Sequence, residues 1–96
     1  MKRREYDIDI LVNRRRITKV IIDSHYEKKH SATVDDQIIL KLVKTLDGEI
    51  IEPDAEDPPY SYFSQDRIEV DGKFYKLIWL LEDDELYVGV VNAYRR

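Results

Sequence analysis

The chain contains no cysteine and only three glycines and three prolines. The lack of cysteine excludes disulfide bonds, thiolate zinc sites and cysteine nucleophiles. No apolar run approaches the roughly 20 residues that a bilayer needs, since the longest is Leu77–Leu81. The basic residues at the start are not followed by the apolar stretch of a signal peptide. We therefore expect a cytoplasmic protein that does not associate with a membrane.

Charge is divided unevenly along the 96 residues, whose net charge is −4. Residues 1–45 hold 11 Lys and Arg and 7 Asp and Glu, whereas residues 46–96 hold 5 and 13. The acidic total lowers the expectation of general nucleic-acid binding, but the basic first half can still offer a local positive face to a polyanion. The length and the 43% of hydrophobic residues fit one globular domain that spans residues 1–96.

Two runs near the end of the chain, 73–82 and 86–95, are rich in β-branched and aromatic residues. Only three acidic residues separate them, so they predict an antiparallel hairpin. The first run is apolar on both alternating faces, which is typical of a strand in the middle of a sheet. We therefore expect this hairpin to form the core, with Trp79 buried.

Three further strands are predicted before this hairpin. Alternation of apolar and polar residues predicts one at about 5–12, and a short polar gap leads to a second at about 16–23. A third covers about 60–70 and ends at the Asp-Gly pair 71–72, a strong type I′ turn signal. The segment 49–59 is acidic and broken by proline, so it is predicted to be a loop.

Two helices are predicted between the second and third strands. Ser24 and Glu27 have the spacing of a capping box, which predicts a short helix at about 25–30. Apolar residues recur at helical spacing over 34–47 after an acidic first turn, which predicts a longer helix whose apolar stripe packs on the sheet. The expected fold class is α+β, with an antiparallel sheet of four to five strands, one long and one short helix, and the order β-β-α-α-β-β-β.

Few residues can carry chemistry. The two histidines lie five residues apart, so on a helix their rings would diverge by about 140° and would not suit one metal ion. We expect no metal site and no cofactor, and the chain has no glycine-rich phosphate loop. Imidazole, lysine and arginine side chains can cleave RNA by acid–base catalysis without a metal. The candidates for such catalysis are His25, His30, Lys29, Arg95 and Tyr94.

Further basic residues are candidates for substrate binding, namely Lys28, Arg96, Arg14, Arg15 and Arg16. The simpler interpretation of the three adjacent arginines is a solvated turn. Seven tyrosines are present, and tyrosine rings can stack on unpaired bases, although most of them are more simply strand residues.

The pattern His-x-x-x-Lys-His over 25–30 and the ending Val-Asn-Ala-Tyr-Arg-Arg over 91–96 resemble the small RelE-type toxins, in particular their BrnT and MqsR branches. The resemblance implies an mRNA endonuclease that is neutralised by an antitoxin covering its basic active face. It carries over only to Lys29, His30, Tyr94 and Arg95. Those toxins are typically basic, whereas this chain is acidic, and this difference puts catalysis in doubt.

The leading hypothesis is a RelE-like toxin-type RNA endonuclease that cleaves without a metal, and whether the chain is an enzyme stays open. The alternative is a noncatalytic protein-interaction module, which predicts an exposed aromatic patch around Tyr60, Tyr62 and Phe63. A third hypothesis is a homodimer formed through an edge strand such as 5–12. The expected partners are thus RNA, an antitoxin protein or a second copy of the chain.

Overall fold

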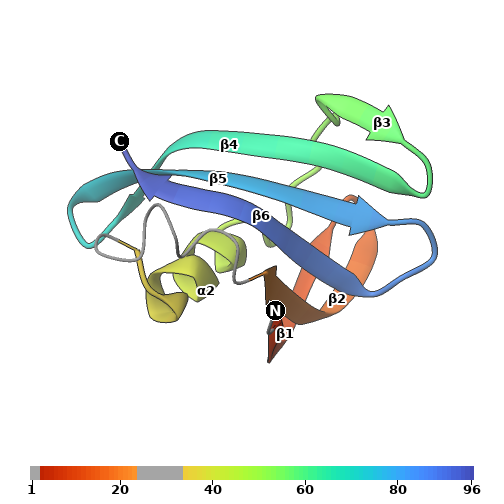
Figure 1. The fold of residues 1–96 in the computed structure, drawn as a ribbon, viewed down its shortest axis with the longest axis horizontal. Coiled ribbons are helices and arrows are strands. Elements are labelled where there is room, and N and C mark those ends of the chain that lie inside the picture. The colour runs from red at the N-terminus through yellow and green to blue at the C-terminus, as the bar shows by residue number, and fades with distance from the viewer. Residues whose placement is uncertain (1–2, 24–33) are drawn as a thin grey trace.

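The computed structural model describes residues 3–23 and 34–96 (Figure 1). These residues form one sheet in the order β1-β2-β6-β5-β4-β3 and a single helix. In chain order the elements are β1 Arg3–Val12, β2 Arg15–Asp23, α2 Asp36–Lys44, β3 Ala55–Asp57, β4 Tyr60–Val70, β5 Lys73–Glu82 and β6 Tyr87–Arg95.

The predicted fold class, α+β with two helices and four to five antiparallel strands, is wrong. Strands account for 61% of the described residues and the helix for 11%, and the sheet has six strands of mixed direction. The short helix predicted at 25–30 lies outside the described residues.

The mixed direction arises where β2 and β6 pair in parallel, with Lys19 beside Tyr87 and Ile22 beside Val90. All other neighbouring strands are antiparallel. After β2 the chain passes under one face of the sheet through α2, so that β4 runs in the same direction as β2 (Figure 1). Two reversals then leave β6 parallel to β2. Hairpin signals are local, so they cannot report a pairing between strands so far apart in the sequence.

Strand β3 was not predicted, and it lies within the segment 49–59 that was expected to be a loop. Its three residues pair antiparallel with Tyr60–Tyr62, and the Asp54 amide donates to the Tyr62 carbonyl at 2.8 Å. Ala, Glu and Asp have low strand propensity. The pairing therefore follows from the turn at Pro58-Pro59, which folds this short segment back onto β4, and not from the side chains of β3.

Helix α2 is shorter than the predicted 34–47. Asp35 caps its start by accepting a hydrogen bond from the Ile38 amide at 2.9 Å, and its apolar side buries Ile39, Leu42 and Val43. The turn that follows ends at Gly48, which has a φ of 83° and donates its amide to the Leu11 carbonyl at 2.7 Å. This bond fastens the segment after the helix to β1. Within the described residues no helix is long and apolar enough to cross a bilayer.

The core lies between α2 and the sheet, which curves around the helix (Figure 1). β-Bulges in β1, β4 and β6 increase the local twist that produces this curvature. β6 and β5 occupy the two middle positions of the sheet. Trp79 is fully buried, stacks on Phe63 with ring centroids 4.1 Å apart, and donates its indole N–H to Gln65 at 3.1 Å. The expected core hairpin is therefore confirmed.

Candidate functional site

One face of the sheet packs on α2, and among residues 3–23 and 34–96 no element covers the opposite face, which we call the open face. Along β5, alternate side chains belong to the two faces. Those toward the helix are buried, namely Tyr75, Leu77, Trp79 and Leu81. Those on the open face are half-buried, namely Lys76, Ile78, Leu80 and Glu82. Apolar side chains on a face without a covering layer mark a surface that can bind a partner.

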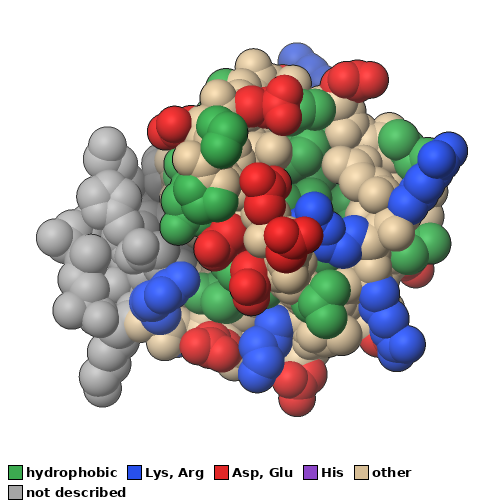
Figure 2. Space-filling view, turned by 90° about the vertical axis from the view of Figure 1, so that its right-hand side faces the viewer, with side chains coloured by type: hydrophobic (Ala, Val, Ile, Leu, Met, Phe, Trp, Pro, Cys, Tyr) green, Lys and Arg blue, Asp and Glu red, His purple; other side chains and the backbone are tan. Residues whose placement is uncertain are grey.

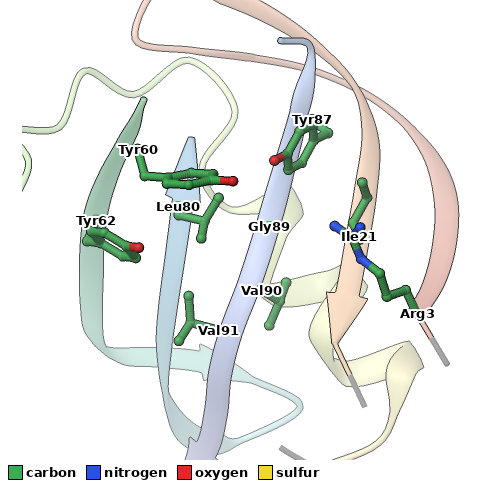
Figure 3. A pocket seen from close by; sticks show the side chains of 9 residues that line it. All are labelled: Arg3, Ile21, Tyr60, Tyr62, Leu80, Tyr87, Gly89, Val90 and Val91. Carbon is green, nitrogen blue, oxygen red and sulfur yellow. The ribbon is translucent and has the colours of Figure 1, made fainter. Parts of the chain in front are cut away.

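A concavity of about 340 Å³ lies on the open face (Figure 3). We call it the tyrosine cup, and it is lined by Tyr60, Tyr62, Tyr87, Leu80, Ile21 and Arg3. The sheet register explains this gathering, because Tyr62 of β4, Leu80 of β5, Gly89 of β6 and Ile21 of β2 are neighbours across four strands. Strands from both ends of the chain therefore build the tyrosine cup.

Gly89 forms the floor of the tyrosine cup. A Cβ atom at this position would lie 2.8 Å from Cδ1 and 3.0 Å from Cγ of Leu80, closer than real contacts allow. Glycine therefore lets the Leu80 side chain lie flat across β6, and glycine inside a strand commonly marks such a close approach. Tyr60 and Tyr62 stand beside Leu80, with ring centroids 6.3 Å apart, and direct their hydroxyls over the sheet toward β6 (Figure 3).

Tyr87 forms the opposite wall of the tyrosine cup and is held there by Glu82. Its hydroxyl donates to the Glu82 carboxylate at 2.5 Å. Burial, followed by this hydrogen bond and the negative charge of Glu82, raises the pKa of Tyr87 well above its ordinary value of 10.0. The phenol therefore stays protonated at neutral pH and remains a donor to Glu82.

A second concavity, of about 520 Å³, adjoins the tyrosine cup and shares Arg3, Ile21 and Tyr87 with it. We call it the acidic groove, since Glu82 at the end of β5 and Asp84 and Glu85 of the β5–β6 turn line it, together with Leu86, Thr18 and Lys19. Figure 2 shows the Asp and Glu side chains gathered at the end of the molecule where this turn lies. The open face thus changes along β6 from acidic to aromatic.

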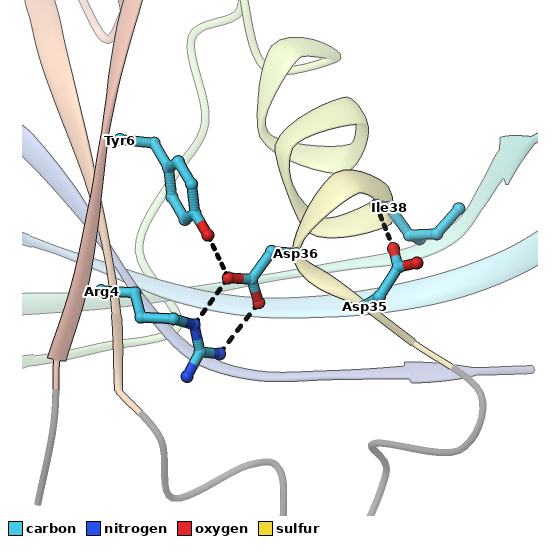
Figure 4. A network of polar contacts seen from close by, with 5 residues as sticks. All are labelled: Arg4, Tyr6, Asp35, Asp36 and Ile38. Carbon is cyan, nitrogen blue, oxygen red and sulfur yellow. Dashed lines mark hydrogen bonds and ion pairs between the residues drawn. The ribbon is translucent and has the colours of Figure 1, made fainter.

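A polar network on the other side of the sheet ties β1 to the start of α2 (Figure 4). Arg4 makes two hydrogen bonds to Asp36, from Nε at 2.6 Å and from Nη2 at 2.9 Å, and the Tyr6 hydroxyl donates to the same carboxylate. The hydrogen bond to Asp36 raises the pKa of Tyr6. Because Asp36 lies in the first turn of the helix, the helix dipole also favours its negative charge. We assign this network a structural role.

The predicted catalytic residues fall into two groups. His25, Lys29 and His30, with the substrate-binding candidate Lys28, lie outside the described residues. Tyr94 and Arg95 end β6, where Tyr94 pairs across strands with Lys76 and Arg95 with Tyr75. Successive strand residues point to opposite faces, so Tyr94 lies on the open face with Lys76, whereas Arg95 lies on the face of buried Tyr75. Arg96 follows and forms an ion pair with Asp66 at 2.9 Å.

The three arginines of the β1–β2 turn lie at the other end of the sheet. Arg14 is exposed in the turn itself. Arg15 donates to the Glu82 carbonyl at 2.8 Å, and Arg16 pairs with Asp9 at 3.1 Å. Lys19 of β2 lies beside Tyr87 at the start of β6. The β1–β2 turn is therefore far from Arg95, which lies at the end of β6. The structure does not bring these arginines together with Tyr94–Arg96.

Of the three residues of the predicted aromatic patch, Tyr60 and Tyr62 lie half-buried on the open face, and the prediction is wrong for Phe63. Strand alternation turns Phe63 to the core, where 3% of it is exposed. Sequence reasoning missed the other residues of the tyrosine cup. Two signals pointed to them, namely the second apolar face of β5 and Gly89 inside a strand. The neighbouring strand β2, with Ile21, had no signal because its pairing with β6 is not local.

The outer edge of β1 bears on the homodimer hypothesis. Its far end is occupied, because the Leu11 amide donates to Asp47 at 2.8 Å and the Asn13 amide to the Glu49 carbonyl at 2.9 Å. An antiparallel pairing of two β1 edges centred on Tyr6 would place Glu5 opposite Asp7. Like charges directly opposite destabilise a strand pair, so this register of β1 against a second β1 is disfavoured.

The described residues include no group of three or more His, Cys, Asp and Glu that could hold a metal ion. Comparison of the chain with protein-family models, with curated proteins and with solved structures gives no match in any of the three. The proposals that follow therefore rest on the residues and their geometry.

Proposed function

We propose that this protein is a small cytoplasmic ribonuclease of the RelE-like toxin type, which binds single-stranded RNA on the open face of its sheet. The supporting observation is the polar end of β6. Tyr94 and Lys76 are cross-strand partners on the open face, next to Asn92, and Arg95 and Arg96 follow at the end of the chain. Hydroxyl, ammonium and guanidinium groups are thus available at one end of the sheet.

The proposal gives the acid–base role to His25 and His30, which follow β2 in the sequence. Ile22 lies beside Val90, the fourth residue of β6, and β2 ends one residue later at Asp23 while running in the same direction as β6. From Asp23 the chain continues to His25 and His30. In the proposed reaction an imidazole removes the proton of the ribose 2′-hydroxyl, the oxygen attacks the adjacent phosphate, and a second acid protonates the departing 5′-oxygen. Lys76, on the open face, stabilises the charge that develops on the phosphate oxygens.

The charge distribution favours one part of the open face for the phosphate that is cleaved. The acidic β5–β6 turn is at the start of β6, whereas Tyr94–Arg96 is at its end. Phosphates next to the turn are repelled by Asp83, Asp84 and Glu85, and this repulsion falls with distance and salt. The polar end of β6 is therefore the part of the open face where a scissile phosphate meets the least electrostatic repulsion.

The test is incubation of the purified chain with end-labelled single-stranded RNA in the presence of a chelator. We expect cleavage by the unmodified chain and a loss of about 10²-fold or more for His30→Ala, which is the range for removal of a general acid or base. Lys76→Ala is expected to slow cleavage as well. Arg16→Ala is the matched control, since this arginine is paired with Asp9 at the far end of the sheet.

Equal activity in all versions, or activity in none, would contradict the ribonuclease proposal. Circular dichroism on each variant separates a loss of chemistry from a loss of fold.

A second candidate function is a noncatalytic polypeptide-binding module, and the acidic groove is the observation that favours it. The groove combines the carboxylates of Glu82, Asp84 and Glu85 with Leu86, which is 51% exposed. A segment with basic and aliphatic side chains matches this lining. The test is co-purification with the product of the adjacent reading frame, which Leu86→Lys is expected to abolish while RNA stays intact.

A further inference from the structure

We propose that the tyrosine cup is the binding subsite for one unpaired nucleobase of single-stranded RNA. This inference rests on the proposed action on RNA, and it concerns binding, which is separable from cleavage. It gives a role to residues that the catalytic proposal does not use.

The lining of the tyrosine cup matches a planar ring. Tyr60, Tyr62 and Tyr87 supply aromatic rings, and Leu80, lying across Gly89, supplies a flat apolar floor. Bases stack on aromatic side chains with little dependence on sequence, because each base has a π face. The hydroxyls of Tyr60 and Tyr62 extend over this floor, where they can exchange hydrogen bonds with the edge of a base (Figure 3).

The size of the tyrosine cup limits its occupant. Its volume of about 340 Å³ is near the lower end of the roughly 300–1,000 Å³ found for small-molecule sites. One nucleotide fits such a volume. Sequence-specific RNA recognition commonly uses single bases that are splayed out of a strand onto aromatic side chains.

Charge favours a nucleotide over a basic side chain in the tyrosine cup. Arg3 is the charged residue of its lining, whereas the Glu82 carboxylate, which accepts the Tyr87 hydroxyl, lines the acidic groove and not the tyrosine cup. A lysine or arginine of a polypeptide would meet the Arg3 guanidinium, whereas the phosphate next to a bound base would be attracted to it. From the tyrosine cup the open face continues through Val91 and Asn92 to Tyr94 and Lys76. A strand bound there therefore leads toward the proposed cleavage end.

The experiment measures binding of a fluorescently labelled, 2′-O-methyl oligouridine, which cannot be cleaved through a 2′-hydroxyl. Its partner probe carries the same phosphates and abasic sugars in place of the bases. We expect the unmodified chain to bind the first probe at least tenfold more tightly than the abasic one. Tyr62→Ala is expected to weaken binding by about 10- to 100-fold, and Tyr62→Phe to weaken it much less, because phenylalanine keeps the ring that stacks and loses only the hydroxyl.

Two further variants test the floor and the charge of the tyrosine cup. Gly89→Ala must push Leu80 outward into the space of the base, so it is expected to weaken binding at least tenfold. Arg3→Gln is expected to lower the slope of log affinity against log salt by about 0.7, the value for one phosphate contact on a single strand. Ile50→Ser is the control, since this side chain is 69% exposed and is not part of the lining.

Three results would overturn the subsite. They are equal binding of the abasic probe, unchanged binding by Tyr62→Ala and Gly89→Ala, and binding of a lysine-rich peptide in place of the oligonucleotide. A chain that cleaves RNA but gives one of these results disproves the subsite alone. Cup-dependent binding without any cleavage supports the subsite and disproves the ribonuclease.

Discussion

Trp79 and Leu80 are neighbours in β5, but they lie on opposite faces of the sheet and in different surroundings. Trp79 is fully buried against Phe63 under α2, whereas Leu80 is half-buried at the floor of the tyrosine cup. The strand is apolar on both faces, but within the described residues a helix covers only one of them. An apolar strand pattern can therefore stabilise the fold through one face of the sheet and leave the other face as a surface for binding.

The largest expected effect tests this division directly. Trp79→Ala removes a fully buried ring and is expected to lower the free energy of unfolding by about 3–5 kcal/mol, the range for large-to-small changes in a core. Leu80→Ala is expected to lower it by only about 1 kcal/mol, because the side chain is only partly buried.

Urea unfolding followed by tryptophan fluorescence for Leu80→Ala, and by circular dichroism for both variants, gives the two values. Comparable losses of unfolding free energy at Trp79 and Leu80 would contradict the expected difference between the two faces. They would mean that the open face is as important for stability as the covered face.

A smaller effect is expected at the network that joins β1 to α2 beneath the covered face. Asp36→Asn removes the charge that Arg4 and Tyr6 share, and we expect a loss of about 1–2 kcal/mol, since hydrogen bonds to charged groups contribute roughly 1.5–3 kcal/mol and this one is partly exposed.

Asp9→Asn is the matched control for this change. The ion pair of Asp9 with Arg16 is exposed, at 74% and 70%, so its loss is expected to cost no more than about 0.5 kcal/mol. Urea midpoints measured at two salt concentrations distinguish the two, because the exposed pair is the more strongly screened. A larger loss at Asp9 than at Asp36 would contradict the assignment.

The smallest effect is expected at alkaline pH, and it compares Tyr6 on the covered face with Tyr87 on the open face. Both have a folded-state pKa above the ordinary 10.0. Each contribution to stability is therefore complete below pH 10 and is lost as the pH rises through the folded pKa. The larger shift belongs to Tyr87, so Tyr87→Phe is expected to flatten the fall in stability above pH 10 more than Tyr6→Phe does.

The measurement is the free energy of unfolding from pH 8 to pH 11 for the unmodified chain and both variants. A steeper fall for Tyr87→Phe than for the unmodified chain would show that Glu82 and burial do not hold the proton on Tyr87.

The parts of the fold that could be predicted are those with local signals. Asp71 and Gly72 both have positive φ, of 52° and 78°, as the Asp-Gly turn signal requires. The burial of Trp79 and the helix that buries Leu42 were also predicted from local patterns. Pairings between distant segments had no such signal, so the parallel contact of Ile22 with Val90 was missed. Tyr60 and Tyr62 were predicted only as part of an exposed aromatic patch of an interaction module, and Arg3 and Ile21 join them only through that contact.

The sequence by itself determined the alternating strands, their tight turns and one amphipathic helix, because these depend on side chains within a few residues of each other. Only the tertiary structure decided that β2 pairs with β6 and that α2 lies on one face of the sheet. Hydrophobic burial is not directional, so an apolar strand such as β5 records that it must be covered but not from which side. The choice of side depends on the path of the whole chain, and that choice left the tyrosines of the open face available for binding.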